Sequence, residues 1–427
     1  MLTFALVLLF ALIGLSIPVA AALGLLGLSL DQLFTVMPLY RAIGDIAWSA
    51  STDFLLVAIP LFVLMGEILL RSGIADRVYR AVSAWITWLP GGIMHANIAA
   101  CTAFAAISGS TVATAATIGT VAIPQMEKRK YGTRLFLGTL ASGGTLGILI
   151  PPSINIIIYG ALTDTSIPEL YLAGILPGLI LAALFSLTVV IACLIRPALG
   201  GERESHSWGE RFRSLVDLVP PAIIFVIVIG SIYAGLATPT ESAALGVVSS
   251  LILAAAYRRL SLAMLKASIE GAMQTTAMIM LIIVAAFFLN LVLSAIGLPQ
   301  AVSAFVTELD YSPTVTLLMI VGLYVVLGLF LETLTLMITT IPIIAPVVFS
   351  LGYDPVWFGI ILMLLIETAL ITPPVGLNLY VIQGVRGRGQ VGDVIYGALP
   401  FVLALMTMIL LLMALPQIAL WLPNAVY

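Results

Sequence analysis

The stretch GGTLGILIPPSINIIIYG, residues 143–160, decides the fold predicted for this chain. It is apolar enough for a membrane interior, yet it carries a Gly-Gly pair and then Pro151-Pro152. Proline removes a backbone donor, clashes with the preceding helical turn and disfavours the α conformation of its neighbour, so a helix must break here. Lipid tolerates such a break only where it is buried in protein or lines a polar cavity. We therefore expect the freed peptide groups to face an ion or a substrate.

A second stretch of the same kind, ETALITPPVGLNLYVIQG, covers residues 367–384. Its Pro373-Pro374 pair again interrupts an apolar run. Interrupted helices in corresponding halves of a chain are the best sequence pointer to the binding site of a secondary transporter. We therefore predict two broken helices, at about 135–160 and 357–382, that share one site.

The composition predicts an all-α polytopic membrane protein. Of 427 residues, 62% are hydrophobic and 9% are charged, whereas soluble domains carry about 25% charged residues. The net charge of −3 and the lack of a basic cluster argue against a nucleic-acid partner. The chain has neither a GxSxG turn nor a GxGD pair, so an intramembrane protease is disfavoured and no enzyme activity or cofactor is expected.

Apolar segments of bilayer length are separated by two pairs of shorter runs. The runs 92–107 and 111–124 span about 24 and 21 Å as helices, less than the hydrocarbon thickness of about 30 Å. The runs 313–328 and 333–346 repeat these lengths, and we interpret both pairs as re-entrant hairpins. The nine full spans are expected at 3–28, 54–70, 135–160, 171–195, 218–237, 241–256, 271–296, 357–382 and 396–416.

The basic residues predict the orientation, because cytoplasmic loops of membrane proteins are rich in Lys and Arg. With this topology only Arg41 lies on the opposite side from the others, so the N-terminus is expected in the cytoplasm and the C-terminus outside. The residues of the cytoplasmic side are Arg71, Arg77, Arg80, Lys128, Arg129, Lys130, Arg134, Arg196, Arg203, Arg211, Arg213, Arg258, Arg259, Lys266, Arg386 and Arg388.

The two halves can be aligned on their proline pairs. The alignment also places Thr145 opposite Glu367 and Pro124 opposite Pro346, and the segment AVSAW (81–85) matches AVSAF (301–305). With the orientation above, the two repeats are inverted. The expected organisation is an N-terminal scaffold span with an interfacial segment (1–53), a first repeat (54–195), a cytoplasmic loop with scaffold spans (196–270), a second repeat (271–416) and a tail (417–427).

The oxygen atoms of the first hairpin tip and of the first helix break are candidate sodium ligands, because sodium prefers hard oxygen atoms. Half-helix ends also offer carbonyl groups to a cation. The alternative is that small hydroxyl residues only allow close helix packing. The residues are Ser108, Gly109, Ser110, Gly143, Gly144 and Thr145.

In the second half, Glu332 at the hairpin tip and Glu367 before the proline pair are ionisable groups at membrane depth. Such groups are costly and usually functional, so sodium ligation or a proton-coupled switch is predicted. Capping of the following half-helix is the alternative. Asn155 and Asn378 are candidate donors to a substrate carboxylate, although a packing hydrogen bond is equally compatible. The full set of candidate substrate contacts is Thr111, Pro151, Ser153, Asn155, Pro374 and Asn378.

Taken together, GGTLGILIPPS, the SGST tip, the TPTES turn at 238–242 and TPPVGLNLYV resemble the large membrane subunit of tripartite ATP-independent periplasmic (TRAP) transporters. The resemblance covers essentially the whole chain. It implies a sodium-driven importer with an elevator mechanism in a bacterial or archaeal inner membrane. It also implies a soluble periplasmic binding protein that delivers an organic acid, and a small four-helix membrane subunit on a separate chain. It adds Gly328 and Thr372 to the sodium candidates.

The expected substrate is a carboxylate such as a C4-dicarboxylate, a sugar acid or sialic acid. The nearest competing function is a stand-alone sodium/dicarboxylate symporter or sodium/proton antiporter of related fold, which would need no delivery protein. A scaffold protein is a third possibility, but it would not need two polar breaks at matched depth.

Overall fold

The computed structural model describes residues 2–15, 17–202, 207–298, 300–301, 304 and 311–426. Every regular element in these ranges is a helix. Within these ranges six helices are long and apolar enough to cross a membrane, and a seventh span results if α4 and α5 count as one. The prediction of an all-helical polytopic membrane protein is confirmed. Two sequence features of the previous section, Arg203 and most of the segment 301–305, lie outside the described residues.

Both predicted breaks and both predicted hairpins are present. The first half contains α4 (Ala58–Ser72), α5 (Ile74–Ile86), α6 (Ile93–Ser108), α7 (Thr111–Lys128), α8 (Thr133–Thr145), α9 (Ile154–Thr163) and α10 (Ile167–Ile195). The second half contains α14 (Leu262–Ala295), α16 (Pro313–Gly328), α17 (Thr333–Ser350), α18 (Pro355–Ile371), α19 (Leu377–Arg386) and α20 (Val391–Ala414).

The order and lengths of these helices repeat. The hairpin helices α6 and α16 each have 16 residues, α7 and α17 each have 18, and the half-helices α9 and α19 each have 10. The same two peptide bonds, Pro151-Pro152 and Pro373-Pro374, are cis. The sequence repeat found by aligning the proline pairs is therefore also a repeat of structure.

The remaining helices flank the two repeats. One prediction differs from the structure: the stretch 3–28 is divided into α1 and α2 and is not one span. Pro18, which directly precedes α2, lacks an amide proton and disfavours helix in the residue before it. The flanking elements are α1 (Leu2–Gly14), α2 (Val19–Phe34), η1 (Leu39–Ala42), α3 (Ile43–Thr52), η2 (Pro197–Gly200), α11 (Trp208–Ser214), η3 (Leu215–Leu218), α12 (Val219–Tyr233), α13 (Pro239–Ala256) and α21 (Gln417–Val426).

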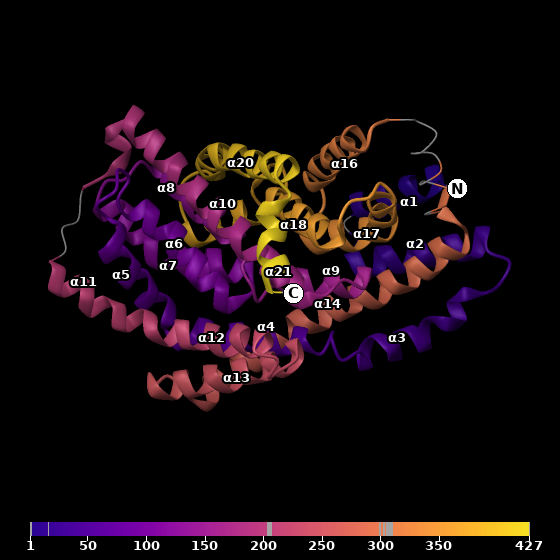
Figure 1. The fold of residues 1–427 in the computed structure, drawn as a ribbon, viewed down its shortest axis with the longest axis horizontal. Coiled ribbons are helices and arrows are strands. Elements are labelled where there is room, and N and C mark those ends of the chain that lie inside the picture. The colour runs from indigo at the N-terminus through magenta and orange to yellow at the C-terminus, as the bar shows by residue number, and fades with distance from the viewer. Residues whose placement is uncertain are drawn as a thin grey trace.

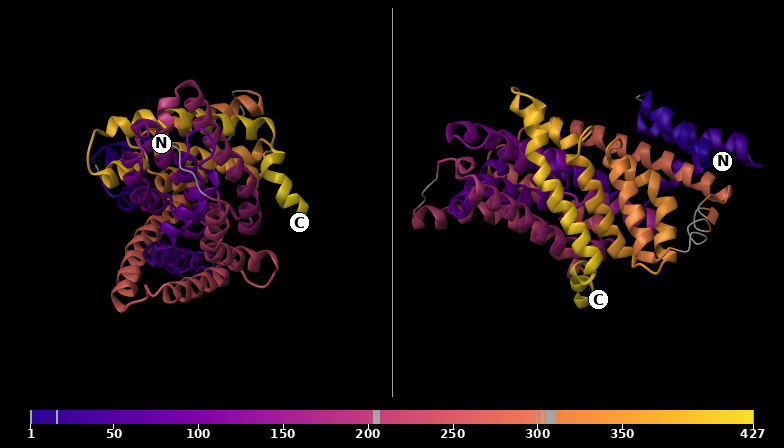
Figure 2. Two further views of the ribbon diagram at one scale, coloured as in Figure 1. Left: turned by 90° about the vertical axis from the view of Figure 1, so that its left-hand side faces the viewer. Right: turned by 90° about the horizontal axis from the view of Figure 1, so that it is seen from above.

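The molecule is elongated, with hairpin α6–α7 toward one end and hairpin α16–α17 toward the other (Figure 1). Helices α11 to α14 follow one long edge. The N-terminal helices α1 and α2 lie at the same end as α16 and α17, which Figure 2 shows from two further sides. Helix α14 packs against α2, α3 and α4. The flanking helices α2 and α3 therefore pack on α14 of the second half, which also contacts α4 of the first half.

The contacts between the two halves are reciprocal. Half-helix α19 packs on α7 of the first hairpin, and half-helix α9 packs on α17 of the second hairpin. In the same way α8 packs on α20, and α18 packs on α10. Each half therefore packs on the equivalent helices of the other half. The first break, residues 146–153, is buried, whereas Pro374 and Val375 of the second break are exposed.

Local capping explains where several helices begin. Thr238 and Glu241 form a reciprocal capping box at the start of α13, so the TPTES turn is a helix start, as the sequence indicated. Helix α4 ends at Gly73, whose φ of +80° favours glycine, and α5 then continues at 70° to α4. The amphipathic segment with Arg77 and Arg80 is thus a helix separate from α4.

Helices α8 and α20 cross at two glycines. A methyl group on Gly138 would overlap the Gly397 carbonyl group, and one on Gly397 would overlap the Arg134 carbonyl group. The two backbones are therefore in direct contact, which is how small residues pack membrane helices.

We expect Gly138→Ala to lower the free energy of unfolding by about 1–3 kcal/mol, because the added methyl group separates the two backbones. Thermal unfolding of the purified protein in detergent measures the change. Gly322→Ala in α16 is the matched control: a methyl group there meets no atom within 4 Å. An equal melting temperature for Gly138→Ala and Gly322→Ala would contradict the proposed backbone contact.

Candidate functional site at the two helix breaks

The first hairpin tip is a tight turn between α6 and α7. Ser108 ends α6, and Gly109 follows with a φ of +62°, a conformation that favours glycine. Ser110 begins α7 by accepting a hydrogen bond from the backbone N–H of Ala113 at 3.3 Å. The Ser108 and Thr114 hydroxyl groups are 2.9 Å apart. The turn therefore brings several hydroxyl and carbonyl oxygens together.

This tip lies directly against the first helix break. A methyl group on Gly109 would lie 2.9 Å from the carbonyl oxygen of Pro152. A methyl group on Gly147 would lie 3.4 Å from the backbone nitrogen of Thr111. Glycine is thus required at 109, where φ is also positive, whereas a methyl group at 147 would make only van der Waals contact with the tip. The SGST tip therefore lies beside the first proline pair in the structure.

The second tip lies against the second break in the same way. A methyl group on Gly328 would lie 2.8 Å from the Cβ of Ala369. The backbone N–H of Val375 donates a long hydrogen bond of 3.4 Å to the Leu329 carbonyl group. Each hairpin tip therefore covers the break of its own repeat.

Glu332 caps helix α17. Its carboxylate accepts hydrogen bonds from the backbone N–H groups of Leu334 (3.1 Å) and Thr335 (3.2 Å), and from the Thr333 hydroxyl group (2.8 Å). The capping interpretation of this residue is thus what the structure shows. The Thr335 hydroxyl group also donates to Oε2 at 3.4 Å, so Oε1, which accepts only from Thr333, is the carboxylate oxygen with acceptor capacity left.

The two breaks are neighbours. The Asn378 side chain, at the start of α19, donates a hydrogen bond of 3.0 Å to the Ala141 carbonyl group in α8. A methyl group on Gly144 would lie 3.2 Å from the same Asn378 nitrogen. The start of α19, which follows the second proline pair, is therefore held beside the C-terminal end of α8, which precedes the first break.

Glu367 contacts the same turn of α8 from α18. Its side chain is fully buried, and its carboxylate faces the Thr145 hydroxyl group and the Leu149 backbone N–H without a hydrogen bond of standard geometry to either. The Thr145 hydroxyl donates instead to the Ser142 carbonyl group at 2.8 Å. The residues aligned from the sequence, Thr145 and Glu367, thus lie next to each other.

Buried polar atoms without partners gather around this turn. Both carboxylate oxygens of Glu367, the side-chain oxygen of Asn378, and the hydroxyl oxygens of Ser142 and Ser153 have no hydrogen-bond partner in the described part of the chain. A carboxylate and an amide oxygen only accept, and leaving acceptors unpaired in an apolar interior costs free energy. A cation at this position would satisfy them.

The other candidates are placed less centrally. Asn155 is half-buried, and the structure records no hydrogen bond for its side chain. The Thr372 hydroxyl donates back to the Thr368 carbonyl at 2.6 Å, and Pro374 is exposed. The carbonyl groups of Gly143 and Gly144 accept long bonds of 3.3 Å within their own turn. No cluster of three His, Cys, Asp or Glu side chains in the described ranges could hold a metal ion, so a sodium site would depend on carbonyl, hydroxyl and single carboxylate oxygens.

One polar network was not found from the sequence. The Tyr79 hydroxyl donates to the Asn97 side chain at 3.0 Å, and Asn97 donates to the Thr139 hydroxyl at 2.9 Å. These residues connect α5, α6 and α8, so the amphipathic helix is tied to the hairpin and to the broken helix. A fully buried Asn in an apolar run, as Asn97 is, was the available signal.

Paired hairpins and paired broken helices that meet in the interior define the architecture of a secondary transporter. Residues 6–418 match the family described as "Tripartite ATP-independent periplasmic transporter, DctM component". The chain belongs to this family of transporter permease subunits, which are not enzymes.

Characterised relatives cover most of the chain. The C4-dicarboxylate TRAP transporter large permease protein DctM of Pseudomonas aeruginosa is 35% identical over 90% of each chain. The ectoine TRAP transporter large permease protein TeaC of Halomonas elongata is 33% identical over 87% of each chain. The YdaH transporter of Alcanivorax borkumensis has a similar fold, with a TM-score of 0.62, 17% identity and coverage of 95% of this chain and 98% of that chain.

We expect Asn378→Leu to lower the free energy of unfolding by about 1–3 kcal/mol, because the Ala141 carbonyl group would be left buried without a donor. The melting temperature of the purified protein measures the loss. Asn155→Leu is the matched control, since Asn155 occupies the same position in α9 but forms no such bond. If the two substitutions lower the melting temperature equally, the bond between the breaks does not stabilise the site.

Proposed function

We propose that this chain imports an organic acid by sodium-coupled secondary transport, as the large membrane subunit of a TRAP transporter. The observation that carries sodium coupling is the fully buried carboxylate of Glu367, which faces Thr145 and forms no hydrogen bond of standard geometry within the described residues. An isolated carboxylate at membrane depth is costly unless a cation or a proton compensates it. Hydroxyl and carbonyl oxygens in the adjacent turn are suitable sodium ligands.

The proposed site has two parts. The first comprises the first hairpin tip with the last turn of α8, and the second comprises the second tip with the end of α18. The reciprocal packing of α7 on α19 and of α17 on α9 supports a two-fold relation between the repeats, which with the proposed topology makes them inverted. The acid would bind between the breaks, where Asn378 is buried and its side-chain oxygen is unpaired.

Movement is proposed to follow an elevator mechanism. The two hairpins and two broken helices would move together, because they are packed on one another. The frame would consist of α1, α2, α12 and α13. The N-terminus would be cytoplasmic and the C-terminus periplasmic, as the basic residues predict. Membership of the family further implies a small membrane subunit and a periplasmic binding protein as partners.

The relatives differ in the substrate that their names give, C4-dicarboxylate in one and ectoine in the other. We propose a carboxylate substrate for this chain, with its choice made largely by the binding protein. The few polar side chains at the breaks support this division, because they offer little to distinguish one acid from another.

The experiment is uptake into proteoliposomes that contain this chain and the small subunit, with a panel of acids and their cognate binding proteins. We expect uptake to require an inward sodium gradient and the binding protein. Uptake without the binding protein would instead show a stand-alone transporter. Uptake that is unaffected by the sodium gradient would contradict sodium coupling.

We expect Thr145→Val to raise the sodium concentration for half-maximal uptake about tenfold, because the isosteric side chain removes one oxygen ligand while preserving the packing. Glu367→Gln is expected to abolish the sodium dependence of uptake. Glu241→Gln is the control, since Glu241 is an exposed capping residue of α13 and Gln also suits a capping box. An unchanged sodium dependence in both site variants would refute the assignment of the site.

A further inference from the structure

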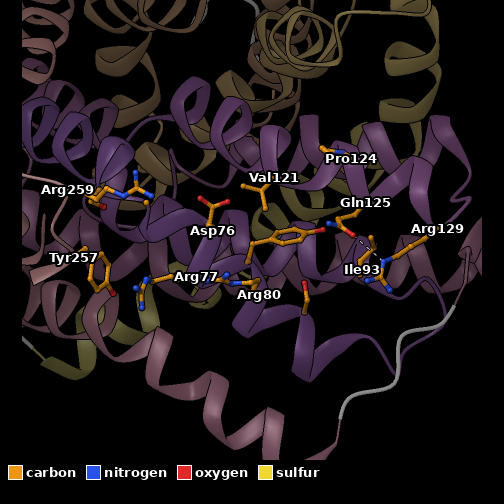
Figure 3. A pocket seen from close by; sticks show the side chains of 14 residues that line it. Asp76, Arg77, Arg80, Ile93, Val121, Pro124, Gln125, Arg129, Tyr257 and Arg259 are labelled. Atoms are coloured by element: carbon orange, nitrogen blue, oxygen red, sulfur yellow. Dashed lines mark hydrogen bonds between the residues drawn. The ribbon is translucent and has the colours of Figure 1, made fainter. Parts of the chain in front are cut away.

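A cavity of about 650 Å³ lies at the junction of α4 and α5, beside α6, α7 and the connection from α13 to α14. Four arginines line it. Figure 3 shows Arg259 toward one end and Arg129 toward the other, with Asp76, Arg77 and Arg80 between them. The cavity is thus on the face that the basic residues assign to the cytoplasm.

The charges of the cavity are only partly compensated. Arg77 forms an ion pair of 3.1 Å with Asp217 and stacks over Tyr257 at 4.1 Å. Arg80 and Arg259 form no ion pair within the part of the chain that the structure describes. Asp76 is the one carboxylate among the lining residues, and it has no ion pair there either.

Arg129 is a further positive charge at the wall, and its guanidinium is 3.4 Å from the Gln125 side-chain oxygen. Ser83 also belongs to the wall: it is 7% exposed, and its buried hydroxyl oxygen has no hydrogen-bond partner in the described part of the chain. The lining therefore carries an excess of positive charge together with an unpaired donor.

A smaller cavity of about 350 Å³ continues from this one along α7. The two share Gly73, Asp76 and Val121 as lining residues. The smaller cavity is also lined by Thr117 and Thr120, and the buried Thr117 hydroxyl has no hydrogen-bond partner. Helix α7 begins at the first hairpin tip, so the polar lining leads from the arginines toward the proposed site.

The second repeat has a corresponding cavity without basic residues. It measures about 430 Å³ and includes Pro346, which aligns with Pro124 of the arginine-lined cavity. Its polar lining consists of Thr163, Asp164, Asn290, Ser294 and Gln300. Positive charge is therefore not a general property of the repeat, and it is confined to one of the two cavities.

We propose that the arginine-lined cavity binds the carboxylate group of the transported acid after the acid leaves the two breaks. The inference rests on the proposed function. Positive side chains in a cleft raise the local concentration of anions, and a guanidinium group binds a carboxylate through two parallel hydrogen bonds. The tendency of cytoplasmic loops to carry Lys and Arg explains the positive charge on this face. It does not explain why the charge lines a cavity, or why a polar lining leads from that cavity toward the site.

The first experiment measures the charge preference of the cavity without any transport. Thr120→Cys is placed in the wall of the adjoining smaller cavity, which shares Gly73, Asp76 and Val121 with the arginine-lined one. Its reaction rates with the anionic reagent sulfonatoethyl methanethiosulfonate and the cationic reagent trimethylammonioethyl methanethiosulfonate are compared. Both native cysteines are buried, so the background reaction is small. Ser294→Cys, in the cavity without arginines, is the matched position.

We expect the ratio of the anionic to the cationic rate at Thr120→Cys to fall at least about fivefold when Arg80→Gln and Arg259→Gln are added, because two nearby unit charges are removed. No such change is expected at Ser294→Cys. A ratio at Thr120→Cys that is independent of the two arginines would overturn the proposal.

Sodium-driven uptake in proteoliposomes then tests the role in transport. Arg80→Gln with Arg259→Gln is expected to reduce uptake about fivefold, whereas the two Lys substitutions should retain most of it. Arg213→Gln with Arg258→Gln removes two charges from the same face outside the cavity and should leave uptake unchanged. Normal uptake in the cavity Gln variant would overturn the proposal while the proposed function stands. Absence of uptake by the unmodified protein, with the charge preference intact, would reject the proposed function instead.

The source of the bound anion is distinguished by repeating the labelling in nanodiscs. Succinate added to discs of phosphatidylcholine should slow the anionic reagent at Thr120→Cys. If phosphatidylglycerol protects the cysteine and succinate does not, the cavity binds a lipid headgroup and the assignment to the transported acid is wrong.

Discussion

The structure depends on one constraint: peptide groups that a broken helix exposes at membrane depth must find partners within the protein. Each break is covered by its own hairpin tip, and the two breaks are joined by the bond from Asn378 to the Ala141 carbonyl group. Glycines at 109 and 328 permit these close approaches. The two halves also stabilise each other, because half-helices α9 and α19 pack on the hairpins of the opposite half.

The two halves differ in charge although their backbones correspond. Ser110 and Glu332 cap the equivalent helices α7 and α17, and Thr145 and Glu367 occupy equivalent ends of α8 and α18. In both pairs the first half has a hydroxyl group and the second has a carboxylate. A cation site with the hydroxyl groups of the first half and one with the carboxylates of the second half would differ in affinity, because a carboxylate adds a full negative charge to the neutral oxygens.

Much of the fold could be predicted because its signals are local. The proline pairs indicated both breaks, and the short apolar runs before and after Ser108 indicated a hairpin. Pro18, within an apolar run, was also a local signal for a helix break. The stretch 3–28 was nevertheless predicted to be one span because of its length. The capping bonds of Glu332 are local as well, and capping was one of the two interpretations of this residue. The partners of other side chains are not local: that Asn97 binds Tyr79 depends on helices brought together only by folding. The alignment of Thr145 with Glu367 predicted their equivalence but not their contact.

That contact suggests how ion binding is coupled to the shape of the protein. A cation that compensates Glu367 would also contact the turn of α8 that contains Ser142 and Thr145, and Asn378 holds the same turn. The ion would therefore favour the arrangement in which both breaks are docked, and this arrangement is also the one that the hairpin tips cover. By linkage, whatever stabilises the docked breaks, including a bound carboxylate, must strengthen the binding of the cation by the same factor. Under the proposed function, coupling would follow from this single shared turn and would require no signal over a distance.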